Sequence, residues 1–253
     1  MNENEPEKPK RRWGWLQWSV VLVVLGLLAC FVISVGCNLW VKRDQMRAAN
    51  SPRDILGLLL TYASEYNGYF PDHGKDLAKF TSNEAFRSFF KEGLLGSTAA
   101  DETEFVSSEM IFGCPESRFN PDQQIGMPPD YAEALTPGEN HWMMIAGLNN
   151  LSPAHYPLVM ENSIEASWPP HWLPSSSKLS WLVSIIRGIL PPRGRSWQGD
   201  TIIIGFCDAS VRTVILERKN NQLHLPATIL KPEGKEPLPT LKILDVEVPE
   251  IRQ

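Results

Sequence analysis

The sequence predicts an α+β protein in which one N-terminal transmembrane helix continues into an amphipathic helix that packs on an antiparallel sheet. Three observations lead to this fold class. Trp13 through Val41 contain no charged residue, an amphipathic pattern follows at 51–66, and short apolar runs bounded by Pro, Gly and Asn fill the second half. The predicted divisions are a basic cytoplasmic tail (1–12), a transmembrane helix (13–41), an α+β domain (42–230) and a Pro-rich C-terminal tail (231–253).

The charge-free stretch has the composition expected of a helix that crosses a bilayer. About 20 apolar residues span a hydrocarbon core of roughly 30 Å. Indole rings favour the headgroup level, and both ends of the stretch carry them, at Trp13, Trp15, Trp18 and Trp40. Because the basic tail before it is short, we expect the N-terminus in the cytoplasm and the domain outside it. The predicted location is the inner membrane, with a single pass.

Two alternatives to a plain anchor stay open at this stage. Leu27–Cys30 and Ser34–Cys37 loosely resemble the sequence at which bacterial lipoproteins are cut and lipidated. Gly26, Cys30 and Ser34 form a small-residue stripe at a spacing of four. Such a stripe lets helices approach closely and predicts a homo- or hetero-oligomer, although small residues are also simply tolerated there.

Charge excludes one class of partner. Without the first twelve residues, which hold four basic and three acidic side chains, the chain keeps 20 basic and 26 acidic residues, a net charge of −6. A domain with this balance has no excess of Lys and Arg to displace phosphate counterions. We therefore expect a membrane and protein partners, and no nucleic acid.

Two helices are predicted after the stem. Ser51–Pro52 suits a helix start, with Pro52 either beginning a new helix or kinking a continuous one. Asn67–Gly68 then ends this helix, because glycine accepts the left-handed conformation of a helix terminus. A second helix begins at Thr81, where Glu84 completes a capping box, and extends to Gly93.

The second half of the chain predicts short strands. Their close spacing leaves no room for crossover helices, so the sheet is expected to be antiparallel, with turns at Asp208–Ala209 and Asn220–Asn221. The predicted strands are Met110–Cys114, Trp142–Ala146, Pro157–Met160, Thr201–Cys207, Val211–Glu217 and Gln222–Ile229. An apolar, Trp-rich insertion at 168–197 interrupts them. It is predicted to be either a helix over the core or a surface for a partner.

Cys114 and Cys207 are the only cysteines outside the stem, and each lies in or beside a predicted strand. In an oxidising compartment they form either a disulfide, which closes a long loop, or two buried thiols. The sequence leaves both alternatives open, because a disulfide requires the two Cα atoms within about 7 Å.

No catalytic spacing is present. The five histidines are scattered, and no Cys-x-x-Cys, Gly-x-Ser-x-Gly or phosphate-binding glycine loop occurs. Glu161, Asp200 and Asp208 are carboxylates at strand ends or turns, where they usually bond to nearby backbone. We therefore predict a protein that is not an enzyme and needs no cofactor or metal.

Several phrases along the chain are similar to those of bacterial pilin-like proteins, the pseudopilins with a C-terminal His-x9-Asp-Gly motif. They appear in family order between about 40 and 215, and are Tyr62–Pro71, Cys114–Ser117, Val159–Asn162 and Gly205–Arg212. The resemblance implies a pilin-like fold and a structural or accessory role in a secretion or pilus-type assembly of the cell envelope.

The chain departs from this family at positions that matter for assembly. Gln198 stands where the motif has His, nine residues before Asp208, and Ala209 replaces the Gly. Ala at positive φ is strained by about 1 kcal/mol, so a different turn is expected there. At the stem, Gly14 is followed by Trp-Leu-Gln-Trp where the family has Phe-Thr-Leu-Ile, and Ser19 stands where the family has a register-setting Glu. We therefore expect a fixed membrane position rather than a polymer. The alternative function is a membrane-tethered binding module of the cell envelope, either with a plain helical anchor or as a lipoprotein.

Overall fold

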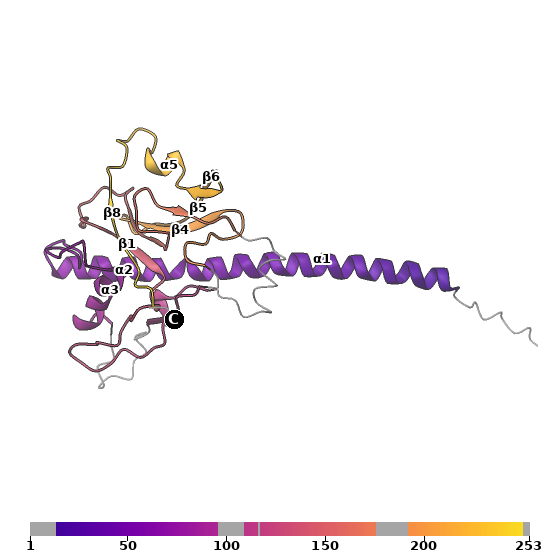
Figure 1. Ribbon diagram of the computed structural model, residues 1–253, viewed down its shortest axis with the longest axis horizontal. Coiled ribbons are helices and arrows are strands. Elements are labelled where there is room, and N and C mark those ends of the chain that lie inside the picture. Colours follow the sequence, from indigo (N-terminus) through magenta and orange to yellow (C-terminus); the bar gives the residue numbers. More distant parts are fainter. Residues whose placement is uncertain (1–13, 96–108, 116, 176–191, 250–253) are drawn as a thin grey trace, which may run out of the picture. The chain divides into compact units, whose positions relative to one another are not determined.

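The computed structural model describes residues 14–95, 109–115, 117–175 and 192–249. The chain forms two compact units, Met1–Arg43 and Asp44–Gln253 (Figure 1). The predicted basic tail at 1–12 and the central part of the predicted insertion, 176–191, lie outside the described residues.

Helix α1 spans Trp15–Ala48. Among the described residues, no helix is long and apolar enough to cross a membrane, so the predicted transmembrane helix at 13–41 is wrong.

Helix α2 spans Asn50–Glu65 and buries one face, formed by Pro52, Ile55, Leu56, Leu59 and Ala63. This confirms the predicted amphipathic helix, although Ala49 precedes it without a side-chain cap. The predicted stop is also confirmed. Gly68 has a φ of 87°, and its N–H donates to the carbonyl of Ala63 at 2.7 Å.

Helix α3 spans Ser82–Lys91 and begins with the predicted capping box. Thr81 Oγ1 accepts from the N–H of Glu84 at 3.1 Å, and Glu84 Oε2 accepts from the N–H of Thr81 at 2.9 Å. Its phenylalanines, Phe86, Phe89 and Phe90, are fully buried beside Phe112. Phe112 lies in a 3-10 helix, η1 (Glu109–Phe112), where a strand at Met110–Cys114 was expected. The prediction of that strand is wrong.

The main sheet has the order β5-β4-β2-β1-β8, and every pairing is antiparallel, as predicted. Its strands are β1 (Trp142–Ala146), β2 (Pro157–Glu161), β4 (Thr201–Phe206), β5 (Val211–Ile215) and β8 (Lys242–Leu244). The 231–253 segment was expected to be extended or loose. Instead it supplies edge strand β8, which pairs with β1 because Ile243 and Leu244 are buried apolar residues.

A smaller sheet has the order β3-β7-β6, formed by β3 (His171–Trp172), β6 (Glu217–Lys219) and β7 (Gln222–His224). Asn220 and Asn221 both have positive φ and form the predicted turn between β6 and β7. A short helix, α5 (Ala227–Leu230), follows where the strand was expected to continue.

The central strands β1, β2 and β4 of the main sheet are buried on both faces. Ile202, Ile204 and Phe206 of β4 belong to a hydrophobic core that also contains Leu223 of β7. The alternate residue Gly205 faces α2 so closely that a Cβ there would lie 2.7 Å from Leu56 Cδ1. In Figure 1, α2 runs along one side of the sheet, and α5 and β6 lie on the other.

Candidate functional site

A buried cluster of Cys114, His141 and Glu161 is the strongest site in the described part of the chain. All three side chains are buried, and one ligand atom of each lies within 4.8 Å of the others. Three parts of the sequence meet here. Cys114 follows η1, His141 directly precedes β1, and Glu161 ends β2. The antiparallel register pairs Trp142 with Glu161 and so brings the ends of β1 and β2 together.

The ring of His141 is held through Nδ1. Ser117 Oγ lies 2.8 Å and Asn162 Nδ2 lies 2.9 Å from this nitrogen. The orientation of the Asn162 amide is fixed by two further bonds. Its Oδ1 accepts from the N–H of Gly194 at 2.9 Å, and its Nδ2 donates to the carbonyl of His141 at 3.1 Å. Because an N–H group of Asn162 points at Nδ1, this nitrogen accepts and the proton of the neutral ring sits on Nε2.

The other ring nitrogen, Nε2, is buried and has no hydrogen-bond partner. Such groups are rare in folded proteins and call for an explanation. Burial, and to a smaller extent the charge of Arg195, lowers the pKa of His141 to about 3. The imidazole is therefore neutral at every physiological pH.

Glu161 is also fully buried. Trp197 Nε1 donates to its Oε1 at 2.5 Å. Burial raises the pKa of Glu161 to about 7, although the bond from Trp197 and the charge of Arg195 lower it. The guanidinium of Arg195 is positioned by a 2.8 Å bond to the carbonyl of Pro115 and lies 4.8 Å from the centre of the Trp197 ring. A buried thiol, imidazole and carboxyl thus share a site beside the half-buried cation of Arg195.

A second cluster, Glu109, Asp122 and Glu139, contains only carboxylates. Its oxygens support the loops between η1 and β1. Glu109 accepts from the N–H groups of Leu135 and Gln123, at 2.7 and 3.1 Å. Glu139 accepts from the N–H of Thr136 at 2.5 Å. Burial raises the pKa of Glu109 to about 7 and also raises that of Glu139. We interpret this cluster as structural.

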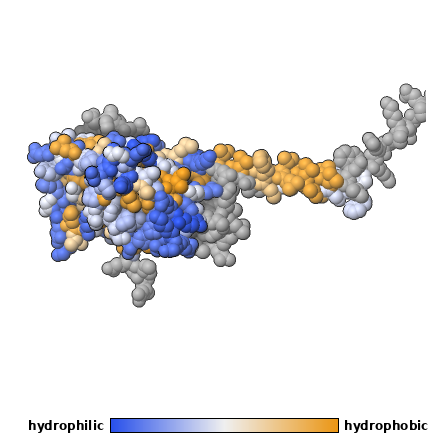
Figure 2. Space-filling model, turned by 90° about the horizontal axis from the view of Figure 1, so that it is seen from above, coloured by the Kyte–Doolittle hydropathy of each residue, from blue (hydrophilic) through white to orange (hydrophobic). Residues whose placement is uncertain are grey.

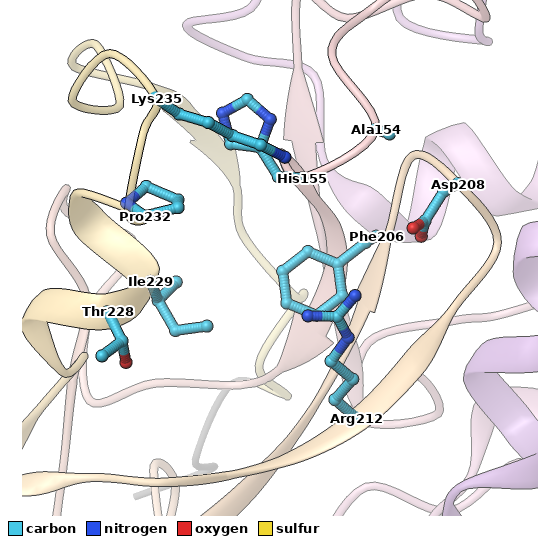
Figure 3. Close-up of a pocket in the computed structure, with 9 residues that line it drawn as sticks. All are labelled: Ala154, His155, Phe206, Asp208, Arg212, Thr228, Ile229, Pro232 and Lys235. Atoms are coloured by element: carbon cyan, nitrogen blue, oxygen red, sulfur yellow. The ribbon is translucent and has the colours of Figure 1, made fainter.

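A small pocket lies beside the β4–β5 turn. Figure 3 shows the side chains of Phe206 and Arg212 from this hairpin, with His155, Ile229, Pro232 and Lys235 around them. The volume is about 130 Å³. Pockets that enclose small-molecule ligands usually measure about 300–1,000 Å³. This pocket is therefore a weak candidate for the site of a binding module.

The motif residues expected from the sequence do not gather at one site. Gly14 and Ser19 lie at the start of α1, where Ser19 Oγ donates to the carbonyl of Trp15 at 3.1 Å. Asn67 and Gly68 end α2, while the remaining three, Gln198, Asp208 and Ala209, flank β4. Asp208 Oδ1 accepts from the N–H of Ser210 at 2.9 Å, which is the predicted bond within the turn.

Two expectations about this turn and the cysteines are settled. Ala209 has a φ of 61°. The expectation of a turn that avoids positive φ is therefore wrong, because the N–H of Ala209 bonds to Phe206 and holds the strained conformation. Cys114 and Cys207 do not form a disulfide with each other. Burial, with the charge of Asp208, raises the pKa of Cys207 to about 12.

The sequence phrases Cys114–Ser117 and Val159–Asn162 contain four residues of this site. His141 was considered only among the scattered histidines, and Arg195 was missed. Ser117 and Asn162 are 24 and 21 residues from His141 along the chain. A search for local metal-ligand spacings cannot detect such contacts. The available signal was the position of His141 directly before the predicted strand Trp142–Ala146. An antiparallel pairing places the start of this strand opposite the end of the next predicted strand, Pro157–Met160.

Comparison with known proteins adds no family: no family model, curated protein or solved structure matches this chain.

Proposed function

We propose that this protein is a non-catalytic, pilin-like subunit with a structural or accessory role in a secretion or pilus-type assembly of the cell envelope. One observation carries the proposal, the exposed apolar surface of α1 (Figure 2). Every residue from Leu22 to Val32 is exposed, and most of them are large and apolar, for example Leu22, Val23 and Leu25. A helix that is apolar on all sides is stable in water only when something covers it.

We propose that other chains of the assembly provide this cover. Gly26 and Cys30 are both exposed on α1, one turn apart, and nothing lies within 4 Å of a Cβ built at Gly26. A small residue at such a position lets a second helix approach closely. The similarity of Tyr62–Pro71 and Gly205–Arg212 to pilin-like proteins supports the same function. The proposed contribution of the 168–197 segment rests on sequence alone, since most of it lies outside the described residues.

In vivo photocrosslinking tests the proposal. A crosslinkable residue at Leu28, which is 53% exposed on α1, should give discrete homo- or hetero-oligomers in living cells. The same residue at Leu151, which is 87% exposed in the second unit, is the matched control and should give none. Gly26→Leu should weaken the Leu28 product, while Val23→Leu, at an exposed and already branched position, should not.

Two results would contradict the proposed function. One is a Leu28 probe that yields only monomer or lipid adducts. The other is a product of equal yield from Leu28 and Leu151, which would indicate unspecific collision. The location in the cell envelope stays a prediction. If the domain lies outside the cytoplasm, protease added to spheroplasts should digest residues 46–253.

A further inference from the structure

We propose that Cys114, His141 and Glu161 form a binding site for a divalent transition metal, with Zn²⁺ as the expected ion. The inference is independent of the proposed assembly role, because it concerns only groups inside the second unit. Thiolate, imidazole and carboxylate are the three ligand types that proteins use for zinc. No local spacing in the sequence predicts this site.

The distances suit a tetrahedral ion after small side-chain movements. Zinc lies about 2.3 Å from sulfur and about 2.0–2.2 Å from nitrogen or oxygen, so two of its ligands are about 3.6 Å apart. One nitrogen of the His141 ring, the Cys114 sulfur and one Glu161 oxygen already lie within 4.8 Å of one another. A contraction of about 1 Å is within the reach of rotations of the Glu161 and Cys114 side chains.

His141 provides the second, independent observation. Its side chain is buried and its Nε2 atom has no partner, whereas Nδ1 is held by Ser117 and Asn162. In a metal-binding histidine, protein groups orient one nitrogen, usually by accepting its N–H, and the other nitrogen is left for the ion. To bind, Nε2 must give up its proton.

The structure offers a hydrogen-bond acceptor for this proton at the other nitrogen. When zinc binds Nε2, the single ring proton moves to Nδ1, and this N–H donates to Ser117 Oγ at the present 2.8 Å separation. Ser117 Oγ already accepts from the N–H of Phe119, and its second lone pair is available. Asn162 gives up its bond to Nδ1 and keeps its bond to the carbonyl of His141. The thiol proton of Cys114 leaves for solvent when the thiolate binds.

The charges of the site are compatible with this ion. Thiolate and carboxylate together neutralise Zn²⁺, and neutral imidazole adds no charge. Arg195 then contributes one further positive charge, which the face of the Trp197 ring beside it attracts and stabilises. The buried location argues for a structural ion, because a substrate would have no access to it.

The test uses the purified full-length chain, without an affinity tag, stripped with EDTA and then dialysed against Zn²⁺. Elemental analysis should find one equivalent of zinc. Co²⁺ in its place should give the thiolate-to-cobalt charge-transfer absorption and the intense visible bands of a tetrahedral site. Both signals should be lost in Cys114→Ser and His141→Gln, and kept in Cys207→Ser, the matched control at a cysteine outside the cluster.

Ser117→Ala tests the positioning bond and should weaken zinc about 10- to 100-fold without abolishing it. The proposal is overturned if the wild-type chain retains no zinc after dialysis, or if cobalt gives no thiolate band. It is equally overturned if Cys114→Ser and His141→Gln bind zinc as tightly as Cys207→Ser. Because the cobalt spectrum is measured on the wild-type chain, it decides the question even where a variant fails to fold.

Discussion

The two polar clusters of the second unit differ in what their ligand-type atoms are bonded to. In the carboxylate cluster, Glu109 accepts from two backbone N–H groups and Glu139 accepts from a third. In the Cys114–His141–Glu161 cluster, His141 Nε2 is buried with no partner. The first cluster serves the backbone of the loops around it, while the second holds a donor atom that no described group uses.

This difference shows that proximity of ligand-type atoms is a poor criterion for a metal site. Both clusters have three such groups within 4.8 Å. The informative quantity is whether those atoms already have partners, since an unsatisfied buried polar atom is destabilising and needs compensation. The predictions below separate a cluster that stabilises the fold by itself from one that does so only with an ion.

The largest effect is expected from Glu109→Ala. This change leaves the N–H groups of Leu135 and Gln123 without their acceptors and should lower the free energy of unfolding by roughly 2–5 kcal/mol. Urea denaturation measures it. Asp122→Ala is the matched control, since this exposed carboxylate accepts from Gln124 and should change stability by less than about 1 kcal/mol. A loss below that level in Glu109→Ala would refute the structural role.

The next effect concerns zinc. An ion present at 100 times its dissociation constant should raise the free energy of unfolding by about 2.7 kcal/mol. The gain should be absent in Cys114→Ser and present in Cys207→Ser. Urea denaturation with and without Zn²⁺ gives the comparison. Equal stabilisation of both variants would place the ion elsewhere on the chain.

Local patterns in the sequence predicted most of the second unit. The capping box at Thr81 and Glu84, the helix stop at Gly68 and strands β1, β2 and β4 depend on neighbouring residues, and all are present. Short-range reasoning failed where distant segments decide the outcome. Phe112 belongs to a 3-10 helix because it packs among the phenylalanines of α3, and Ile243 forms a strand because β1 offers it an edge.

The candidate site was harder to predict for the same reason. Cys114 and Glu161 were considered separately, one for a disulfide and the other as a strand-end acid. Only the fold brings them to His141, whose partners come from 24 residues before it and 21 residues after it. The orphaned Nε2 is a property of packing and has no counterpart in the sequence.

A further prediction concerns the β4–β5 turn, which lies outside both polar clusters. Ala209 has a φ of 61°, so Ala209→Gly relieves strain and should stabilise the fold by about 1 kcal/mol. Ala227→Gly, in the first turn of α5, is the control of opposite sign and should destabilise by up to about 1 kcal/mol. Thermal unfolding compares them. Loss of stability in Ala209→Gly would contradict the observed turn.

The smallest effect is the contribution of Glu109 in the carboxylate cluster to the pH dependence of stability. Burial first, then the charges of Glu139 and Asp122, raises the pKa of Glu109 to about 7 from its ordinary 4.5. Between these values the folded chain holds a proton that the unfolded chain has released. The free energy of unfolding therefore falls as pH rises from about 4.5 to 7, and is level above that.

Asp122→Asn removes one of the negative charges that raise the pKa of Glu109, and so should reduce this decline. The expected change is below about 1 kcal/mol, because Asp122 is exposed and solvent screens its charge. Urea denaturation at pH 5 and pH 8 measures the decline in each chain. Asp130→Asn changes an exposed acid outside both clusters and is the control. Its free energy of unfolding should fall between pH 5 and pH 8 as much as that of the wild type. Glu161 adds a decline of the same sign from the other cluster, which Asp122→Asn leaves in place. If the free energy of unfolding falls equally in Asp122→Asn and the wild type, the charge of Asp122 does not raise the pKa of Glu109 in the folded state.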